Sequence, residues 1–301
     1  MTVRAHVLWR VFCLSMLTLF ASGGASPAPL TEIKIGDERR INFNDGWRFL
    51  KGEAEGAEKP GFDDSSWREV QLPHDWAIEG PFDRKYNPHC GALPFYGIGW
   101  YRKVFTLPER SKDRYFSIEF DGAMANSRVW LNGKELGGRP YGYIGFSFDL
   151  TSNLRFGGQE NVVAVRLAPE DQSSRWYPGA GIYRNVWLTA TGPVCVARWG
   201  TFITTPEVSN NKATVVIKTV IQNRGSQPSQ ITLETSINDA NGKTVSRVAS
   251  DRTVPAGANE GGEQKLEVPD PQRWDINRPY IYRAVSTVLD GKRVLDRYVT
   301  A

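Results

Sequence analysis

Apolar and polar residues alternate at every second position along most of this chain, and helical periodicity is scarce. The alternation is clear over residues 116–120 and again over residues 163–167. A period of two places successive side chains on opposite faces of a β-strand. Asn132-Gly133 directly follows another such run and favours the two-residue turn of a β-hairpin. The pattern predicts an antiparallel, all-β fold.

One β-sandwich is predicted over residues 38–193. Its strands are short and numerous, the first starting around Asn42 and the last lying around Val186–Leu188. A segment of this size with many short strands favours a jelly roll, in which two antiparallel sheets pack face to face.

A second, immunoglobulin-like β-sandwich is predicted over residues 194–301. Aromatic residues thin out after Gly192-Pro193, which indicates a domain boundary. Alternating runs over residues 213–221 and 231–237 follow, and turn signals recur at the spacing typical of such sandwiches. Later strands are expected around residues 265–268 and 281–289. The Cys-Trp-Cys arrangement of antibody domains is missing, so we do not expect membership of that group.

Residues 1–28 predict a secretory signal peptide. Basic residues precede an apolar run over residues 11–21, and small residues follow up to Ala28. The run is too short to cross a membrane, and it lacks the amphipathic period of a buried helix. We therefore expect a periplasmic or secreted mature chain with no membrane span and no lipid anchor.

The distribution of charge argues against a nucleic-acid partner. The formal net charge is +4, and both signs are interspersed without the basic stripe that nucleic-acid binding needs. We expect no nucleic-acid partner.

Cys13 lies in the predicted signal peptide, which leaves Cys90 and Cys195 as the cysteines of the mature chain. These two could form one disulfide, but we expect two separate thiols, and we expect no metal site or cofactor because no ligand cluster is present.

The segment Ser173–Trp187 concentrates aromatic residues and two arginines around a Pro-Gly-Ala-Gly turn. Aromatic faces pack on the apolar face of a pyranose, while guanidinium and backbone groups bind its hydroxyls. The segment favours sugar recognition, with a well-packed corner of a β-sandwich as the alternative.

Five short motifs occur in order along the first predicted domain: Asn44–Phe49, Leu72–Trp76, Gly99–Lys103, Val129–Gly133 and Gly181–Trp187. Together they resemble the N-terminal region of the family-2 glycoside hydrolases, the group that contains β-galactosidases, β-glucuronidases and β-mannosidases. Asp275–Tyr282 resembles a short signature near the end of that family's second domain. Pro-His-Asp-Trp and Arg-Trp-Tyr-Pro-Gly-Ala-Gly are most similar to the β-galactosidase branch.

The resemblance implies a jelly-roll sugar-binding domain, an immunoglobulin-like domain and then a catalytic barrel of eight strands and helices. Such a barrel needs about 250 residues, and the two predicted β domains occupy residues 38–301. The two glutamates of retaining hydrolysis would belong to the barrel, so we assign no catalytic residue. We expect the non-catalytic N-terminal portion of a secreted β-galactosidase-like hydrolase, inactive alone and able to dock to a barrel.

The resemblance also implies that jelly-roll loops reach the mouth of the barrel. Arg175, Trp176 and Tyr177 are on this basis the candidate residues for binding a β-galactoside or related glycan. Asn87, in the loop 83–96, is the closest match by spacing to an amide side chain near the substrate, with a surface loop of turn-forming residues as the alternative. Several family members carry an aspartate where this chain has Arg175. Because an arginine repels cations and favours carboxylates, no sodium site is expected here.

Other conspicuous polar and aromatic residues are interpreted as structural. Asp63-Asp64 is interpreted as a turn, Asp75 as a structural hydrogen bonder and Arg184 as a member of an ion pair at the sheet. Five tryptophans are interpreted as core residues rather than sugar platforms, namely Trp47, Trp67, Trp76, Trp100 and Trp130.

Two other function classes remain open. One is a stand-alone carbohydrate-binding module that has lost its barrel. The other is an extracellular structural or adhesive protein built from two sandwiches. Galactoside binding by the chain would separate these two classes, and the coding sequence after codon 301 would separate both from part of a hydrolase.

Overall fold

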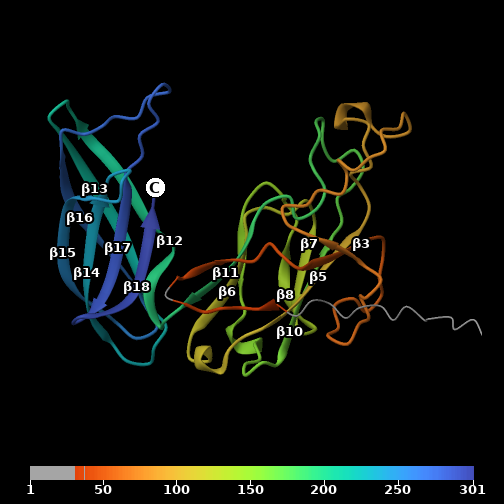
Figure 1. The fold of residues 1–301 in the computed structure, drawn as a ribbon, viewed down its shortest axis with the longest axis horizontal. Coiled ribbons are helices and arrows are strands. Elements are labelled where there is room, and N and C mark those ends of the chain that lie inside the picture. The colour runs from red at the N-terminus through yellow and green to blue at the C-terminus, as the bar shows by residue number, and fades with distance from the viewer. Residues whose placement is uncertain (1–30, 37) are drawn as a thin grey trace, which may run out of the picture.

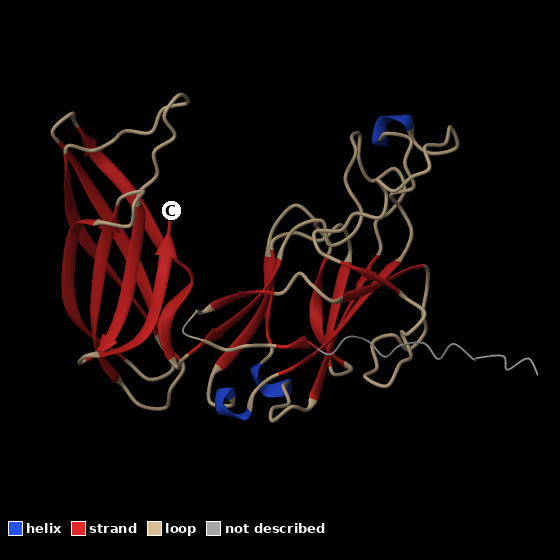
Figure 2. Ribbon diagram, in the orientation of Figure 1, coloured by secondary structure: helices blue, strands red, loops and turns tan. Residues whose placement is uncertain are grey.

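The computed structural model describes residues 31–36 and 38–301, so the predicted signal peptide lies outside the described residues. Two β-sandwiches follow one another along the chain and lie side by side (Figure 1). Strands dominate both, and the described helices are short 3₁₀ turns (Figure 2). The predicted all-β fold, a jelly roll followed by an immunoglobulin-like sandwich, is confirmed. Among the described residues, no helix is both long and apolar enough to cross a membrane.

The first sandwich contains a seven-stranded and a four-stranded sheet. The larger sheet has the order β4 (Arg68–Val70), β3 (Trp47–Lys51), β5 (Gly99–Thr106), β10 (Glu160–Leu167), β7 (Ser127–Leu131) and β8 (Lys134–Arg139), with β1 (Thr31–Glu32) parallel to β5. The smaller sheet has the order β2 (Arg40–Asn42), β11 (Val186–Thr191), β6 (Tyr115–Phe120) and β9 (Phe146–Asp149). Three 3₁₀ helices join strands of this domain: η1 (Pro88–Cys90), η2 (Glu109–Ser111) and η3 (Thr151–Asn153).

The hairpin between β7 and β8 has the turn that the sequence predicts. Asn132 and Gly133 both adopt positive φ angles, 52° and 84°, and the flanking strands pair on either side of them. Two successive left-handed residues match the twist of an antiparallel ribbon. The fully buried Trp47 packs between the sheets and donates its Nε1–H to the carbonyl oxygen of Phe43 at 2.7 Å.

The five tryptophans are all buried, which confirms their interpretation as core residues. Trp47 and Trp76 belong to the main core, between the sheets. Trp67, Trp100 and Trp130 form a second apolar cluster with Ala57 and Ala164. Ala57 and Trp67 belong to the loop of residues 52–67, which packs on Trp100, Trp130 and Ala164 and so covers the face of the larger sheet that points away from the main core.

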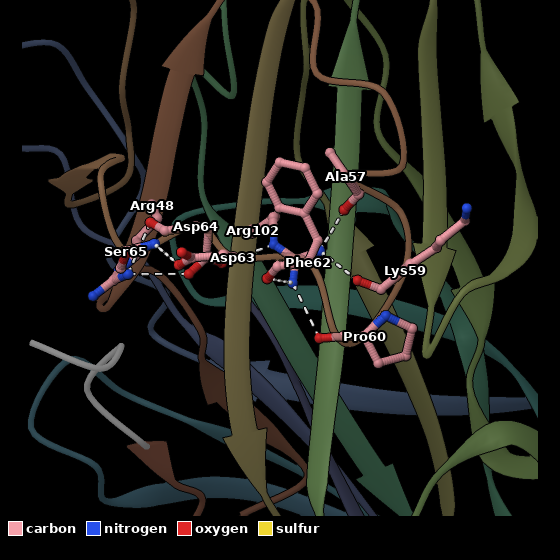
Figure 3. A network of polar contacts seen from close by, with 9 residues as sticks. All are labelled: Arg48, Ala57, Lys59, Pro60, Phe62, Asp63, Asp64, Ser65 and Arg102. Atoms are coloured by element: carbon pink, nitrogen blue, oxygen red, sulfur yellow. Dashed lines mark hydrogen bonds and ion pairs between the residues drawn. The ribbon is translucent and has the colours of Figure 1, made fainter. Parts of the chain in front are cut away.

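A buried ion network fixes the 52–67 loop on that face (Figure 3). Arg102 on β5 is only 1% exposed and donates from Nε to Oδ2 of Asp64 at 2.7 Å. Its Nη1 donates to the carbonyl oxygens of Ala57 and Lys59. Arg48 on β3 donates to Oδ1 of the same Asp64 at 3.0 Å. Asp64 also starts the turn that the sequence predicts, because its carbonyl oxygen accepts the backbone N–H of Trp67 at 3.0 Å. The role that the sequence did not indicate is that of its carboxylate, which neutralises two buried guanidinium groups.

The second sandwich contains seven strands in sheets of three and four. One sheet has the order β12 (Val194–Val208), β13 (Lys212–Asn223) and β16 (Asn259–Pro269). The other has the order β15 (Thr244–Val254), β14 (Ser229–Asn238), β17 (Arg283–Asp290) and β18 (Arg293–Thr300). Antiparallel pairing and this strand count are typical of immunoglobulin-like sandwiches.

A buried carboxylate connects the two domains. Asp296 on β18 accepts hydrogen bonds from Nη1 of Arg39 at 2.7 Å and from the backbone N–H of Val196 at 2.8 Å. Arg39, just before β2, also donates to the carbonyl oxygen of Val196 at 3.1 Å.

Cys90 and Cys195, one in each domain, are buried and free, which confirms the expectation of two separate thiols.

Lys103 on β5 makes folding stability depend on pH at the alkaline end. Its side chain is buried, with Nζ donating to the carbonyl oxygen of Asp45 and lying 4.3 Å from the centroid of the Phe43 ring. Burial lowers the pKa of Lys103 to about 8, against a smaller opposing effect of Asp45. Above that pKa the unfolded chain holds more protons at this lysine than the folded chain, until the unfolded lysine also titrates near 10.5. Its contribution to the free energy of unfolding therefore rises with pH across this window.

Lys103→Met is expected to remove this rise, which is at most about 1.4 kcal/mol per pH unit. Urea denaturation of both proteins at about pH 8 and about pH 10 measures the difference. Lys265→Met, at an exposed lysine on β16, is the control and should keep the wild-type dependence. If the free energy of unfolding of Lys103→Met rose with pH as steeply as that of the wild type, Lys103 would not be the group responsible for the rise.

Candidate functional site

Loops from three parts of the chain meet at one end of the first sandwich. They comprise residues 74–98, residues 140–145 and residues 170–182. Figure 2 shows η1 at this end, away from η2 and η3. Cys90 at the end of η1 donates its thiol to the carbonyl oxygen of Ser174 at 3.4 Å, which joins the first of these loops to the third. This loop end contains all four sugar-binding residues that the sequence predicts.

Asp75 holds the third loop in place. Its Oδ2 accepts the Tyr177 hydroxyl at 2.6 Å, and its Oδ1 accepts the backbone N–H groups of Ala180 and Ala77, each at 3.0 Å. Backbone hydrogen bonds from His74 to Ile182 and from Trp76 to Ala180 pair the two segments. These contacts confirm Asp75 as a structural hydrogen bonder.

The close pairing of these segments requires glycine at position 181. Gly181 has a φ of 128°, and a Cβ there would collide with the carbonyl oxygen of His74 and the hydroxyl of Tyr101. Glycine alone adopts this conformation without strain. The Pro-Gly-Ala-Gly turn thus sets how near the 176–182 segment approaches Asp75.

Tyr177 and Trp176 differ in how far they are exposed. Tyr177 is half-buried against the core, and burial together with the hydrogen bond to Asp75 raises the pKa of its hydroxyl. Trp176 is 60% exposed and donates its Nε1–H to the hydroxyl of Tyr143 at 2.8 Å. Of the pair, Trp176 is the residue with an accessible aromatic face.

Arg175 and Asn87 occupy different settings within the loop end. Arg175 is exposed, and among the described residues it has no hydrogen bond or ion pair. The side-chain oxygen of Asn87 accepts the backbone N–H of His89 at 2.9 Å and caps η1. Asn87 is connected to the Arg175–Tyr177 segment through Cys90, at the other end of η1. The guanidinium of Arg175 is therefore free to meet a ligand, whereas one end of the Asn87 amide already has a structural partner.

Tyr141 and Tyr143 were not singled out from the sequence, yet both are exposed, and Tyr143 accepts the hydrogen bond from Trp176. Their ring centroids lie 5.4 Å apart. The available signal was the Tyr-Gly-Tyr run within a loop, but nothing local shows that Trp176, 33 residues further along, lies next to it.

Arg184 does not have the predicted role. It is exposed and forms no ion pair with the described residues; instead, its aliphatic stem closes over Gly122, where an added Cβ would lie 2.9 Å from Cδ of Arg184. The expectation of an ion pair at the sheet was wrong because its acidic neighbours on this sheet have other partners. Glu119 lies near Arg40 and Arg198, and Asp121 lies near Arg40.

The loop end offers recognition chemistry. It presents a free guanidinium, phenol groups and aromatic faces, while Asp75, its central carboxylate, already accepts three hydrogen bonds. Within residues 31–36 and 38–301, no group of three His, Cys, Asp or Glu side chains is placed to hold a metal ion. The described residues form two sandwiches and include no barrel of parallel strands and helices.

Known protein families match both domains. Residues 43–192 match the sugar binding domain of glycosyl hydrolases family 2, and residues 199–301 match a second model of glycosyl hydrolases family 2. A β-galactosidase of Bacteroides ovatus is 44% identical over 88% of this chain and 31% of its own length. A β-glucuronidase of Formosa agariphila is 30% identical over 89% of this chain and 30% of its own.

Solved structures agree. The crystal structure of a glycosyl hydrolase family 2 member from Bacteroides cellulosilyticus superposes with a TM-score of 0.81 at 35% identity, covering 87% of this chain and 35% of that one. This chain thus spans about a third of the length of the relatives it matches. By its two matching domains and their fold, the chain belongs to glycoside hydrolase family 2.

Proposed function

We propose that this chain is the sugar-recognition portion of an exported β-galactosidase-like hydrolase. Cleavage of terminal β-galactosides would take place in a catalytic barrel outside the two described domains. The β-galactosidase identity of the 44% identical relative and the Arg-Trp-Tyr-Pro-Gly-Ala-Gly motif support the galactoside class. The signal-like residues 1–28 support export.

The observation that carries the proposal is the fixed loop end with its free Arg175. Asp75 and Cys90 hold the loops from within the chain, so Arg175 and Trp176 face outward from a preformed support. Pre-organised loops on a rigid sandwich are where binding residues are expected. The guanidinium donates hydrogen bonds in a fixed fork, which suits sugar hydroxyls and carboxylates.

Exposed apolar residues on the same loops support docking of a barrel at this end. Ile78, Phe82 and Ile144 are all exposed, although large apolar side chains are ordinarily buried. Large exposed apolar side chains on neighbouring loops support a surface that another protein surface covers. If a barrel docked on these residues, Arg175 would lie at the rim of the barrel.

Arg175→Ala is expected to weaken binding of methyl β-D-galactopyranoside by at least about tenfold, because a charge-assisted hydrogen bond contributes about 1.5–3 kcal/mol. An NMR titration of the 301-residue chain measures the dissociation constant. Arg184→Ala, at another exposed arginine of the same segment, is the matched control and should bind like the wild type. If both variants lost galactoside affinity to the same extent, or if neither lost any, Arg175 would not be part of the sugar-binding site.

A stand-alone carbohydrate-binding module is the second candidate. It is favoured by one observation, namely that the hydrogen bonds fixing the loops at Asp75 and Cys90 are made by residues of the first sandwich itself. The coding sequence after codon 301 separates the two candidates. A continuing frame that encodes a barrel with paired glutamates supports the hydrolase, and a stop codon supports the module.

A further inference from the structure

Three exposed aromatic residues at the loop end are linked through Tyr143 and are called here the aromatic surface: Tyr141, Tyr143 and Trp176. Trp176 and Tyr141 are 60% and 57% exposed, and Tyr143, which contacts both, is 37% exposed. The Trp176 Nε1–H donates to the Tyr143 hydroxyl at 2.8 Å, and the two tyrosine rings are tilted by 59° with centroids 5.4 Å apart. The hydrogen bond fixes the indole relative to the tyrosine pair.

Backbone contacts hold the aromatic surface in this arrangement. Gly142, between the two tyrosines, lies so close to Met124 that an added Cβ would be 2.9 Å from the Met124 Cα. Its carbonyl oxygen accepts the hydroxyl of Tyr183 at 3.0 Å. Met124 in turn exchanges two backbone hydrogen bonds with Gly181. Both loops that carry the aromatic residues are therefore anchored at Met124, and the rings need little ordering when a ligand arrives.

The chemistry around these rings suits a sugar. The Tyr141 hydroxyl has no hydrogen-bond partner among the described residues, and neither does the neighbouring guanidinium of Arg175. Aromatic faces next to free donors bind both the C–H face and the hydroxyls of a pyranose. Ile78, Phe82 and Ile144 on the same loops lack any polar side-chain atom, which suits an apolar protein surface instead.

We propose that the aromatic surface is a stacking subsite for a second pyranose unit of an oligosaccharide, next to the unit bound by Arg175. The inference rests on the proposed function, because it uses the same loop end, and it assigns Tyr141 and Tyr143 a role in recognition. Arg175 is adjacent to Trp176 in the chain, so neighbouring sugar units span the two groups. The subsite makes the chain prefer a disaccharide to a monosaccharide.

NMR titrations of the 301-residue chain with lactose and with methyl β-D-galactopyranoside test the subsite. We expect lactose to bind about two- to tenfold more tightly, as one aromatic stacking contact would give. Trp176→Ala and Tyr141→Ala should reduce this preference to near unity. Trp274→Ala, which removes an exposed tryptophan of the second domain, should leave it unchanged.

The outcomes separate the subsite from the proposed function. Equal binding of the two sugars by the wild-type chain, or a preference retained in both variants, would overturn the subsite and leave galactoside recognition standing. Binding of neither sugar would overturn both. Tyr141 makes no side-chain hydrogen bond among the described residues, so Tyr141→Ala keeps the test decisive even where Trp176→Ala fails to fold.

Discussion

Asp64→Ala is expected to lower the free energy of unfolding of the first domain by about 3–5 kcal/mol, the range for breaking a buried ion pair from one side. The substitution leaves the 1%-exposed Arg102 without its carboxylate partner, and it removes the carboxylate acceptor of Arg48, whose Nη1 keeps its hydrogen bond to the carbonyl oxygen of residue 64. A buried guanidinium without a counter-ion bears its full desolvation penalty. Because Asp64 also holds the 52–67 loop, the tryptophan cluster beneath that loop should become accessible.

Asp63→Ala is the matched control for this prediction. Asp63 is the neighbouring residue, and its Oδ1 accepts one backbone hydrogen bond, from Ser65 at 3.0 Å. Loss of that bond should cost about 1 kcal/mol. Urea denaturation followed by tryptophan fluorescence measures both variants. If Asp64→Ala and Asp63→Ala lowered the free energy of unfolding by similar, small amounts, the buried ion network in Figure 3 would contribute little to stability.

Asp75→Ala is expected to cost about 3 kcal/mol and to weaken galactoside binding. It removes the acceptor of three hydrogen bonds, at about 1 kcal/mol each, and leaves the half-buried Tyr177 hydroxyl without its partner. The 176–180 segment should then open locally, so hydrogen exchange at the Ala180 and Ala77 amides should accelerate. Binding falls because Arg175 and Trp176 lose their fixed support.

Asp83→Ala serves as the control in the same loop region. Asp83 is half-buried near the edge of the loop end and accepts the backbone N–H of Lys85 at 3.0 Å, a local turn contact. Its loss should change neither the Ala180 exchange rate nor the galactoside affinity. Wild-type affinity in Asp75→Ala would mean that the Asp75 contacts do not position the binding residues.

Local sequence patterns were sufficient to predict the architecture. Alternation of apolar residues marks strands with one buried face, and Asn132-Gly133 marks a hairpin because both positions need positive φ. The strand β15 was missed. Its side chains are mostly polar, because it lies at the edge of its sheet and pairs with β14 on one side. An edge strand of this kind lacks the continuous apolar face that makes strands visible in a sequence.

The polar contacts of the folded chain could not be predicted in the same way. Asp64 binds arginines 16 and 38 residues away, so its neighbours in the sequence indicate only a turn. Likewise, Tyr143 accepts a hydrogen bond from Trp176 although 33 residues separate the two in the chain. By contrast, Asp75 was interpreted from the sequence as a structural hydrogen bonder, and its three accepted hydrogen bonds show that role. Long-range pairings of this kind depend on how the loops fold over the sheets, which no local pattern specifies.

The most direct test of the account measures binding and turnover together on the 301-residue chain. The chain is incubated with a chromogenic β-galactoside, and bound sugar and released chromophore are followed in the same sample. Recognition without a catalytic barrel predicts that the galactoside binds through the loop end and that no chromophore is released. Appreciable release by the purified chain, or the absence of any binding, would contradict the assignment of these two domains to sugar recognition.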